Sequence, residues 1–504
     1  MAETNGKKTG TRQAAVSAAE GTVATRVGKA PAVASRARIS KNPPPESAKP
    51  SQPRAKVKKA RQRTASYGTR INLISAQPAV TTSHSTADEK RLPARLSRDL
   101  EFSFVKELVT RIVAECPLRQ PTSDDERRAS EIMRVEFEQL GLQVREHQFQ
   151  FSDSLYANGL LHTLPVVMGT AISGIAPALA LPLHLLPAVS YWLESTRKAY
   201  LGRRLMGFKP SQNILGTFPA ESGKPVLRIV ICAHVDAAFT GFIFWPSTIK
   251  AVGREAPFGL KSLHRGVELT VRTQLALAAC DLARMFLGPL AWPLRPLEWL
   301  LTVPSLATAA FHLDVVLRNQ IVPGANDDLS GVAALPLLAR RLVASKRPDV
   351  ELVFIATGCE EASLGGGDAI ARDFDGEWDK TQTVVLGLDG IANGDLRYLV
   401  EEGEVVARRI PDWLDRLCKE VSASESRFAE VTGFEVPIGG SDLSAFLARG
   451  WDGVCLACVD PELGAPRHYH MTSDTPENLE IDKVLYSVDY AEKLVGAIVK
   501  HRLG

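Results

Sequence analysis

Several apolar segments of this chain end directly in a histidine or a carboxylate, and this pattern constrains the fold more than any other feature. Residues 226–233, 350–357 and 383–388 are runs made mostly of Val, Ile, Leu and Ala. Such runs are typical of central strands that are covered by helices on both faces. The sequence therefore predicts an α/β fold, in which the side chains at the carboxyl ends of the strands gather at one edge of the sheet.

Further segments predict the elements around this sheet. Residues 102–112 and 124–140 have helical periodicity, and residues 331–343 form an amphipathic helix. Residues 143–151 alternate between polar and apolar, as a half-buried strand does. We expect the ordered α/β domain to cover residues 93–504.

The first 92 residues differ from the rest in composition. Residues 1–90 contain 17 Lys or Arg against 5 Asp or Glu, although the whole chain carries a formal charge of only +3. Because a segment with so little apolar surface cannot offset the entropy lost on ordering, we predict a disordered basic tail over residues 1–92. This tail is either a solvated linker or a segment attracted to anionic lipid, and nucleic acid is not an expected partner.

Two long apolar stretches interrupt the α/β pattern. No charged residue occurs between Asp153 and Glu194, and Gly and Pro near the middle divide this stretch into two pieces of about 18 residues, near the lower limit for crossing a bilayer. The second stretch, residues 285–313, contains charges. We predict apolar helical insertions at about 155–194 and 240–320.

We expect residues 155–194 to associate with a membrane, because basic residues follow directly at 198–204. In the second stretch Arg295 and Glu298 are costly in hydrocarbon, which argues against the same role there. The alternative for both stretches is an apolar cap or a dimer surface that packs on the α/β domain.

Two observations concern the compartment. The chain begins with a polar stretch that lacks the apolar region of a secretory signal, and its seven cysteines do not have the spacing of a disulfide framework. We expect a reducing compartment, with the α/β domain held at a membrane on the cytoplasmic side or otherwise cytoplasmic. Cys455 and Cys458 lie three apart on a predicted strand, so we expect buried thiols that face opposite sides.

The first candidate site residues are His234 and Asp236, which share a face at the end of the strand 226–233. An imidazole in this position can bind a metal while the carboxylate fixes its other ring nitrogen. Asp327 and Asp328 precede the predicted helix 331–343. A carboxylate there either bridges two cations or caps the helix, and the sequence leaves both roles open.

The remaining candidates are Glu360, Glu361, Asp389 and His470. Glu360 and Glu361 are adjacent carboxylates after a strand, and a cation that neutralises one leaves the other free to act as a general base. Taken alone, Asp389 would be a strand-end cap and His470 a surface histidine. Together these residues predict two cations that share a carboxylate and activate water at neutral pH.

The motifs that contain these residues resemble those of a known family. They are Ala-His-x-Asp at 233–236, Gly-Ala-x-Asp-Asp-x-Ser-Gly at 324–331, Glu-Glu at 360–361, Leu-Asp at 388–389 and Tyr-His-x-x-x-Asp-Thr-Pro-Glu-Asn at 469–478. Their order and context are similar to those of the bacterial leucyl aminopeptidase and aminopeptidase Y family of dinuclear zinc exopeptidases. The resemblance is good over 210–237 and 321–495, and weak over 95–150. It implies a three-layer α/β/α sandwich around a central mixed sheet.

The resemblance also implies a role for each candidate residue and two Zn²⁺ per chain. His234 and Asp389 would hold one zinc ion, Glu361 and His470 would hold the other, and Asp327 would bridge them. Glu360 would be the general base, and Asp236 would orient His234. The implied function is an aminopeptidase that attacks peptides with a free N-terminus by means of a zinc-bridged hydroxide.

The chain departs from the family in two places. His234 and Asp327 are 93 residues apart, far more than the usual connection, and Leu443 follows Ser441-Asp442 where the family often has His. These departures leave the substrate contacts open, and the sequence does not reveal the group that stabilises the oxyanion. The alternatives are a glutaminyl cyclase-like or carboxypeptidase activity on the same fold, or a membrane scaffold with a retired site. The intact set of ligands and Glu360 argue against the scaffold.

Overall fold

The structure is a computed structural model that describes residues 95–253, 266–437 and 439–504. The predicted tail over residues 1–92 lies outside the described residues. The chain that follows begins with two helices and the first strand of a central sheet, close to the predicted positions.

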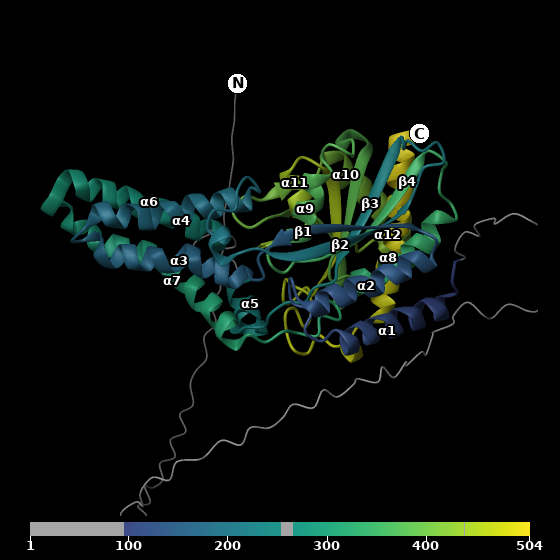
Figure 1. The fold of residues 1–504 in the computed structure, drawn as a ribbon, viewed down its shortest axis with the longest axis horizontal. Coiled ribbons are helices and arrows are strands. Elements are labelled where there is room, and N and C mark those ends of the chain that lie inside the picture. Colours follow the sequence, from purple (N-terminus) through teal and green to yellow (C-terminus); the bar gives the residue numbers. More distant parts are fainter. Residues whose placement is uncertain (1–94, 254–265, 438) are drawn as a thin grey trace, which may run out of the picture. The chain divides into compact units, whose positions relative to one another are not determined.

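The described residues form one nine-stranded mixed sheet (Figure 1). Strands β4, β3, β5 and β9 run parallel to one another in the middle, while β1, β2, β6 and β7 form antiparallel pairs toward the edges. The order across the sheet is β1 (Gln143–Phe151), β2 (Lys209–Phe218), β4 (Val350–Thr357), β3 (Leu227–His234), β5 (Thr383–Leu388), β9 (Asp452–Val459), β6 (Asp395–Glu402) and β7 (Arg408–Arg409), with β8 (Thr432–Glu435) paired in parallel to β6.

Helices cover both faces of this sheet, which confirms the three-layer α/β/α architecture. Helices α1 (Arg98–Glu115), α2 (Asp124–Gln139), α8 (Leu329–Val343), α10 (Asp412–Ser424) and α12 (Ile481–Leu503) form one layer, and α9 (Gly365–Asp373) and α11 (Asp442–Ala448) form the other. Because the central strands are covered on both sides, consecutive residues such as Val230 and Ile231 in β3, or Phe354 and Ile355 in β4, are all buried. Short 3-10 helices occur in the connections as η1 (Arg203–Met206), η5 (Lys380–Gln382), η6 (Ser426–Phe428) and η7 (Pro476–Asn478).

The two apolar insertions are helical and pack against each other. The first is the hairpin α3 (Leu155–Ser173) and α4 (Pro177–Ser195). The second contains η2 (Phe242–Phe244), α5 (Pro246–Gly253), α6 (Gly266–Leu287), η4 (Gly288–Leu294) and α7 (Arg295–Arg318). Helix α3 packs on α4 and α7, and α6 packs on α4 and α7. We call α3, α4, α6 and α7 the bundle. Its helices lie side by side and extend away from the sheet (Figure 1).

The helices of the second insertion lie within the predicted range 240–320, but the apolar run at 285–313 covers them only in part. Helix α6 begins at Gly266, well before this run, and α7 begins at Arg295. The first half of α6 contains the polar residues Thr270, Thr273 and Gln274, which are buried in the structure. A search for apolar residues therefore finds only the end of α6, because its polar residues face the interior of the bundle.

Candidate metal centre

Three parallel strands deliver predicted ligands to one edge of the sheet. His234 is the last residue of β3, the Glu360–Glu361 pair follows β4, and Asp389 follows β5. In the register of β3 and β4, His234 lies opposite Thr357, so these strands end together. Asp327 comes from the loop before α8, and His470 comes from the connection between β9 and α12. The structure thus brings all five predicted metal ligands and Glu360 to the carboxyl edge of the sheet.

The predicted ligands form two groups that share Asp327. Ligand atoms of His234, Asp327 and Asp389 all lie within 4.8 Å of one another, and so do those of Asp327, Glu361 and His470. His234 Nε2 is 3.2 Å from Asp327 Oδ1, and His470 Nε2 is 3.1 Å from Asp327 Oδ2. Each oxygen of Asp327 therefore faces a different histidine, which is the arrangement that a bridging carboxylate needs.

A third grouping includes the predicted base. Ligand atoms of His234, Glu360 and Glu361 also lie within 4.8 Å of one another, and Glu360 Oε2 is 3.9 Å from His234 Nε2. Glu360 thus borders the same space as the ligands of the first group. Whether Glu360 serves as a ligand or as a base can be tested by neutralising its side chain, because only a ligand is needed to retain the metal.

The polar atoms around this space fit a cation. His234 Nε2 and Glu361 Oε1 are buried and make no hydrogen bond within the described part of the chain. Glu361 Oε1 lies 3.4 Å from His470 Nε2. A buried polar atom without a partner costs free energy, about 1–3 kcal/mol, and more if it is charged. Imidazole nitrogens and carboxylate oxygens are ligands that zinc accepts, so the residues present fit two zinc ions.

Burial and crowding set the electrostatics of the centre. Burial raises the pKa of Glu360 and of Glu361 well above the ordinary value, and their acidic neighbours raise both further. Burial, with a contribution from Asp327, raises the pKa of Asp389 to about 7. Burial also acts to raise the pKa of Asp327, but its contacts with His234 and His470 hold that pKa well below the usual range. This concentration of carboxylates is stabilised by positive charge.

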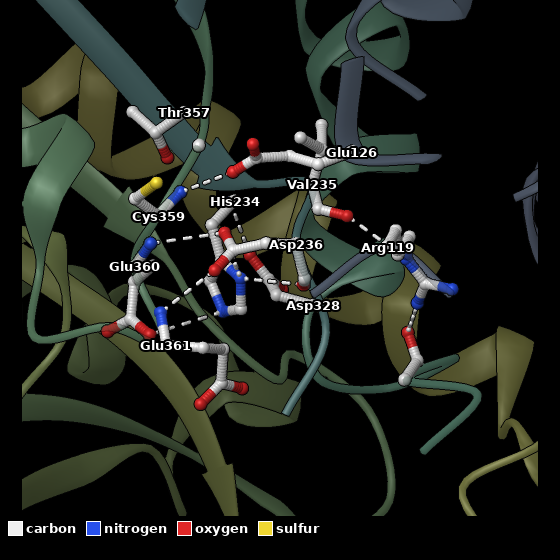
Figure 2. Close-up of polar contacts among 12 residues, drawn as sticks. Arg119, Glu126, His234, Val235, Asp236, Asp328, Thr357, Cys359, Glu360 and Glu361 are labelled. Carbon is white, nitrogen blue, oxygen red and sulfur yellow. Dashed lines mark hydrogen bonds and ion pairs between the residues drawn. The ribbon is translucent and has the colours of Figure 1, made fainter. Parts of the chain in front are cut away.

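Asp236 orients both the histidine and the glutamate pair. Its Oδ1 accepts from the Glu360 backbone N–H at 3.1 Å, and its Oδ2 accepts from the Glu361 N–H at 2.9 Å (Figure 2). The same carboxylate lies 3.5 Å from His234 Nδ1. One buried side chain therefore connects the end of β3 to the loop after β4, and it fixes Glu360 and Glu361 relative to His234.

Asp328 takes the capping role that the sequence left open between two aspartates. Its Oδ1 accepts from the N–H groups of Gly331 and Gly390, both at 3.0 Å, and its Oδ2 accepts from the His234 N–H at 3.1 Å. Asp328 is thus the N-cap of α8, and it also ties the ends of β3 and β5 together. Asp327 is left free to face the two histidines.

The loop that carries Asp327 is held from two sides. Asp474 accepts from the Asn326 N–H at 2.8 Å and from the Asp327 N–H at 3.1 Å. Gly324 has a φ of +59°, and a Cβ there would lie 2.5 Å from the Asp327 carbonyl oxygen, so the turn requires glycine. Arg119, which is fully buried, donates to the Gly324 carbonyl at 2.9 Å and to the Val235 carbonyl at 3.0 Å.

Aromatic residues from both insertions line the centre. The ring of Phe244 in η2 lies 4.4 Å from the ring of His470, and Tyr469 packs on the same imidazole. Tyr156, at the start of α3, stacks edge-on against Phe244 and against His312 of α7. The insertions therefore form a wall of the site at the base of the bundle.

Sequence reasoning missed several of these contributors. Glu126 lies in the first turn of α2, and it accepts from the Cys359 N–H at 2.7 Å just before Glu360. Burial, with the nearby Asp236, raises the pKa of Glu126 to about 8. The helical periodicity of residues 124–140 gives no indication of this contact. Tyr156 and Phe244 were missed because only the three-dimensional fold brings the insertions to the metal centre.

The cysteines agree with the sequence prediction. All seven are free and buried. The Cys455 thiol donates to the Leu456 carbonyl of its own strand at 3.6 Å, whereas Cys458 Sγ lies 4.0 Å from the Ser487 hydroxyl of α12. The two thiols do not share a ligand position.

Comparisons with known proteins relate part of the chain to a peptidase family. Residues 306–494 match the model of peptidase family M28, a range that contains Asp327, Glu360, Glu361, Asp389 and His470. A protein of Pyricularia oryzae named "Probable zinc metalloprotease" is 35% identical over 83 residues, which are 16% of this chain and 15% of that protein. In its C-terminal part the chain therefore resembles the zinc peptidases of family M28, and it spans only a small part of the curated relative.

Three solved structures that match most of the chain share little sequence with it. A zinc aminopeptidase from Bacillus subtilis is 13% identical with a TM-score of 0.45, and the match covers 81% of this chain and 95% of that one. A glutaminyl cyclase from Bacteroides thetaiotaomicron is 14% identical with a TM-score of 0.44, covering 80% and 98%. A Zn-dependent exopeptidase from Parabacteroides distasonis is 12% identical with a TM-score of 0.44, covering 81% and 99%.

Proposed function

We propose that the chain is a zinc-dependent exopeptidase, and specifically an aminopeptidase that acts on peptides with a free N-terminus. The observation that supports this most strongly is the pair of ligand groups joined by Asp327, with Glu360 beside them. His234, Asp327 and Asp389 would hold one zinc ion, and Asp327, Glu361 and His470 would hold the second. When bound, zinc acts as a Lewis acid on a carbonyl and lowers the pKa of water.

Glu360 acts as the general base in this proposal. Its carboxylate borders the ligand groups, and Asp236 fixes its backbone through the bond to the Glu360 N–H. Glu360 takes a proton from the attacking water and later gives that proton to the leaving amine. Burial raises the pKa of the Glu360 carboxyl in the metal-free chain, and bound zinc would lower that pKa, so the loaded site would hold Glu360 as a carboxylate that accepts a proton.

The groups around the site bear on the choice of substrate. The side chains that approach the two groups are the carboxylates of Asp327, Glu360, Glu361 and Asp389, together with two histidines. The buried Arg119 lies behind the Asp327 loop and donates to backbone carbonyls, so it is not placed to receive a C-terminal carboxylate. Two bound zinc ions would offset the charge of the four carboxylates, so the choice of a free N-terminus rests on the resemblance of the motifs to those of zinc aminopeptidases.

The test offers three substrates side by side to the purified full chain loaded with zinc: leucyl-anilide, a glutaminyl peptide, and a peptide with a blocked N-terminus and a free C-terminus. We expect release of the anilide and hydrolysis of the glutaminyl peptide at its N-terminus. Formation of a cyclised N-terminus would support the glutaminyl cyclase alternative, and cleavage of the blocked peptide would support the carboxypeptidase. Two bound zinc ions without turnover of any substrate would support a retired scaffold.

A further inference from the structure

The outer surface of the bundle is apolar over its whole length. Leu179 of α4 is 65% exposed, Phe286 of α6 is 87% exposed and Leu300 of α7 is 67% exposed, and Met168 of α3 is exposed as well. A helix on the surface of a water-soluble domain normally turns its apolar stripe toward the core and its polar face outward. The bundle has the opposite distribution.

The interior of the bundle contains many polar side chains beside apolar ones such as Val166 and Leu277. Gln274 of α6 donates to the His162 carbonyl of α3 at 2.9 Å and to the Ser305 hydroxyl of α7 at 3.3 Å. The hydroxyls of Thr170 and Thr302 lie 2.7 Å apart between α3 and α7. Small and polar residues at the contacts between helices are typical of bundles surrounded by lipid, where apolar burial does not drive the helices together.

Charged residues near the far end of the bundle, where α6 ends and α7 begins, are paired inside it. Asp281 accepts from the Ser173 hydroxyl at 2.5 Å and lies 2.6 Å from His184 Nδ1, and both Asp281 and His184 are fully buried. Arg284 makes a two-pronged ion pair with Glu298. We call Ser173, His184, Asp281, Arg284 and Glu298 the bundle cluster. Of the two charges that argued against a membrane role for the second insertion, Glu298 is therefore buried and paired, whereas Arg295 reaches it from the surface with 30% of its side chain accessible.

Away from the end next to the sheet, where Arg272 of α6 and Arg318 of α7 are exposed, the outer surface is also almost free of charge. Residues 155–193 contain no charged residue at all. Between 273 and 313 the charged residues are Asp281, Arg284, Arg295 and Glu298, and of these only Arg295 is substantially exposed, with 30% of its side chain accessible. Arg295 donates to the Ala171 carbonyl near the end of α3, so part of its charge is directed at the bundle itself.

The helices have the length of a bilayer crossing. The four contain 19, 19, 22 and 24 residues. At about 1.5 Å per residue they are about 28 to 36 Å long, against a hydrocarbon thickness of about 30 Å. By length and composition, Leu155–Ser173 and Gly266–Arg318 are each apolar enough to cross a membrane.

Tryptophans with neighbouring cations mark both ends of the bundle. At the end next to the sheet, Lys198 lies over Trp192 at 4.8 Å and Arg318 lies over Trp245 at 5.9 Å. At the far end Arg295 lies over Trp299 at 5.3 Å. Tryptophans and long cationic side chains gather at the two interfaces of a membrane, where an aromatic body meets hydrocarbon and a charged head meets lipid phosphate.

We infer that the bundle is embedded in the hydrocarbon of a lipid bilayer as two helical hairpins, with the metal centre at the membrane surface. Four observations support a lipid bilayer as the occupant of the apolar surface. They are the apolar side chains on the outside of the bundle, the charges paired inside it, the helix lengths close to the bilayer thickness, and the tryptophans with neighbouring cations at both ends. A second copy of the chain would cover one side of the bundle, whereas apolar residues are exposed on all four helices. The inference does not depend on the proposed hydrolytic function.

The test is flotation of the purified full chain with vesicles of phosphatidylcholine and phosphatidylserine after detergent removal, followed by extraction with high salt and with alkaline carbonate. We expect the chain to float with the vesicles and to resist both extractions. Met168→Glu, Leu179→Glu and Leu300→Glu in one variant should lower the floating fraction at least about tenfold, because each places a charge on the lipid-facing surface. The matched control carries Leu100→Glu, Leu118→Glu and Val226→Glu, at exposed apolar positions of the α/β domain, and should float like the parent.

A second measurement does not depend on the variant folding. Tryptophan fluorescence of the unmodified chain should be quenched by vesicles with brominated acyl chains, and Trp292→Phe with Trp299→Phe should reduce the quenched fraction. A chain that stays in solution without detergent as a discrete oligomer would overturn the inference and favour a second copy as the occupant. Release by high salt alone would also overturn it, because it would show attachment through surface charge.

Discussion

The metal centre and the bundle cluster both bury charged side chains. The charges of the bundle cluster are paired within the chain, whereas those of the metal centre are not fully paired. In the bundle cluster each charge has a partner of opposite sign or a hydroxyl, as in Arg284 with Glu298 and Asp281 with His184 and Ser173. At the metal centre carboxylates outnumber the histidines, and buried atoms of His234 and Glu361 lack hydrogen bonds within the described chain. The bundle cluster therefore satisfies its own charges and supports the fold, whereas the metal centre is arranged for cations that the chain does not itself provide.

Neutralising Glu360 should give the largest effect and affect function alone. We expect Glu360→Gln to lower turnover of leucyl-anilide about 10²- to 10⁴-fold, the usual size of general acid–base catalysis, while the zinc content stays unchanged. Glu146→Gln, at an exposed position of β1, is the matched control and should behave like the parent. Loss of zinc together with activity would instead assign Glu360 to the ligand group of His234 and Glu361.

Breaking the bundle cluster should affect stability. Arg284→Met removes one of the two arginines that pair with the buried Glu298 and leaves Arg295, whose Nη1 lies 3.1 Å from Glu298 Oε2. Because breaking a buried pair outright costs about 3–5 kcal/mol, the free energy of unfolding, measured in detergent micelles, should fall by less than about 3 kcal/mol, while zinc content and KM stay close to the parent. Adding Glu298→Leu to Arg284→Met should recover most of the loss; failure to recover would mean that the pair does more than satisfy its own charges.

Asp236 connects the histidine to the glutamate pair, so its loss should have an intermediate effect. Asp236→Asn keeps the size of the side chain, removes the charge near His234 Nδ1, and leaves one acceptor oxygen for the two N–H groups of Glu360 and Glu361. We expect about 10- to 100-fold weaker zinc binding, the typical cost of losing the partner of a metal-binding histidine. The measurement is a zinc titration of the chelated variant, and an unchanged affinity would show that neither the charge of Asp236 nor its second backbone contact supports the metal ligands.

The chelated chain should show a pH dependence that zinc abolishes. Burial, with Asp327, raises the pKa of Asp389 to about 7, and burial raises the pKa of Glu360 and Glu361 too. The folded state then keeps protons that the unfolded chain has released, so stability is present at low pH and is lost as pH rises through about 7. The net change is small, because protonation of one carboxylate relieves its neighbours. Thermal unfolding at pH 5 and pH 8, with chelator or zinc, measures it; equal stability in chelator would contradict this electrostatic description.

The sequence was most informative where a pattern depends on neighbouring residues. Strands 143–151, 350–357 and 383–388 match the predicted ranges, because their apolar residues are adjacent in the chain. It was less informative where roles depend on packing. Asp327 and Asp328 are chemically identical, and only the cap on α8 separates the bridging candidate from the capping residue. The charges of α6 and α7 appeared unsuited to a membrane because the sequence does not show that Arg284 faces Glu298.

The most direct test of the metal centre is the zinc content of the purified full chain, measured by elemental analysis. It is combined with leucyl-anilide hydrolysis before chelation, after chelation and after zinc is restored. The account predicts about two zinc ions per chain, loss of hydrolysis on chelation and recovery with zinc. A chain that binds no zinc, or that hydrolyses the anilide equally well in chelator, would contradict it.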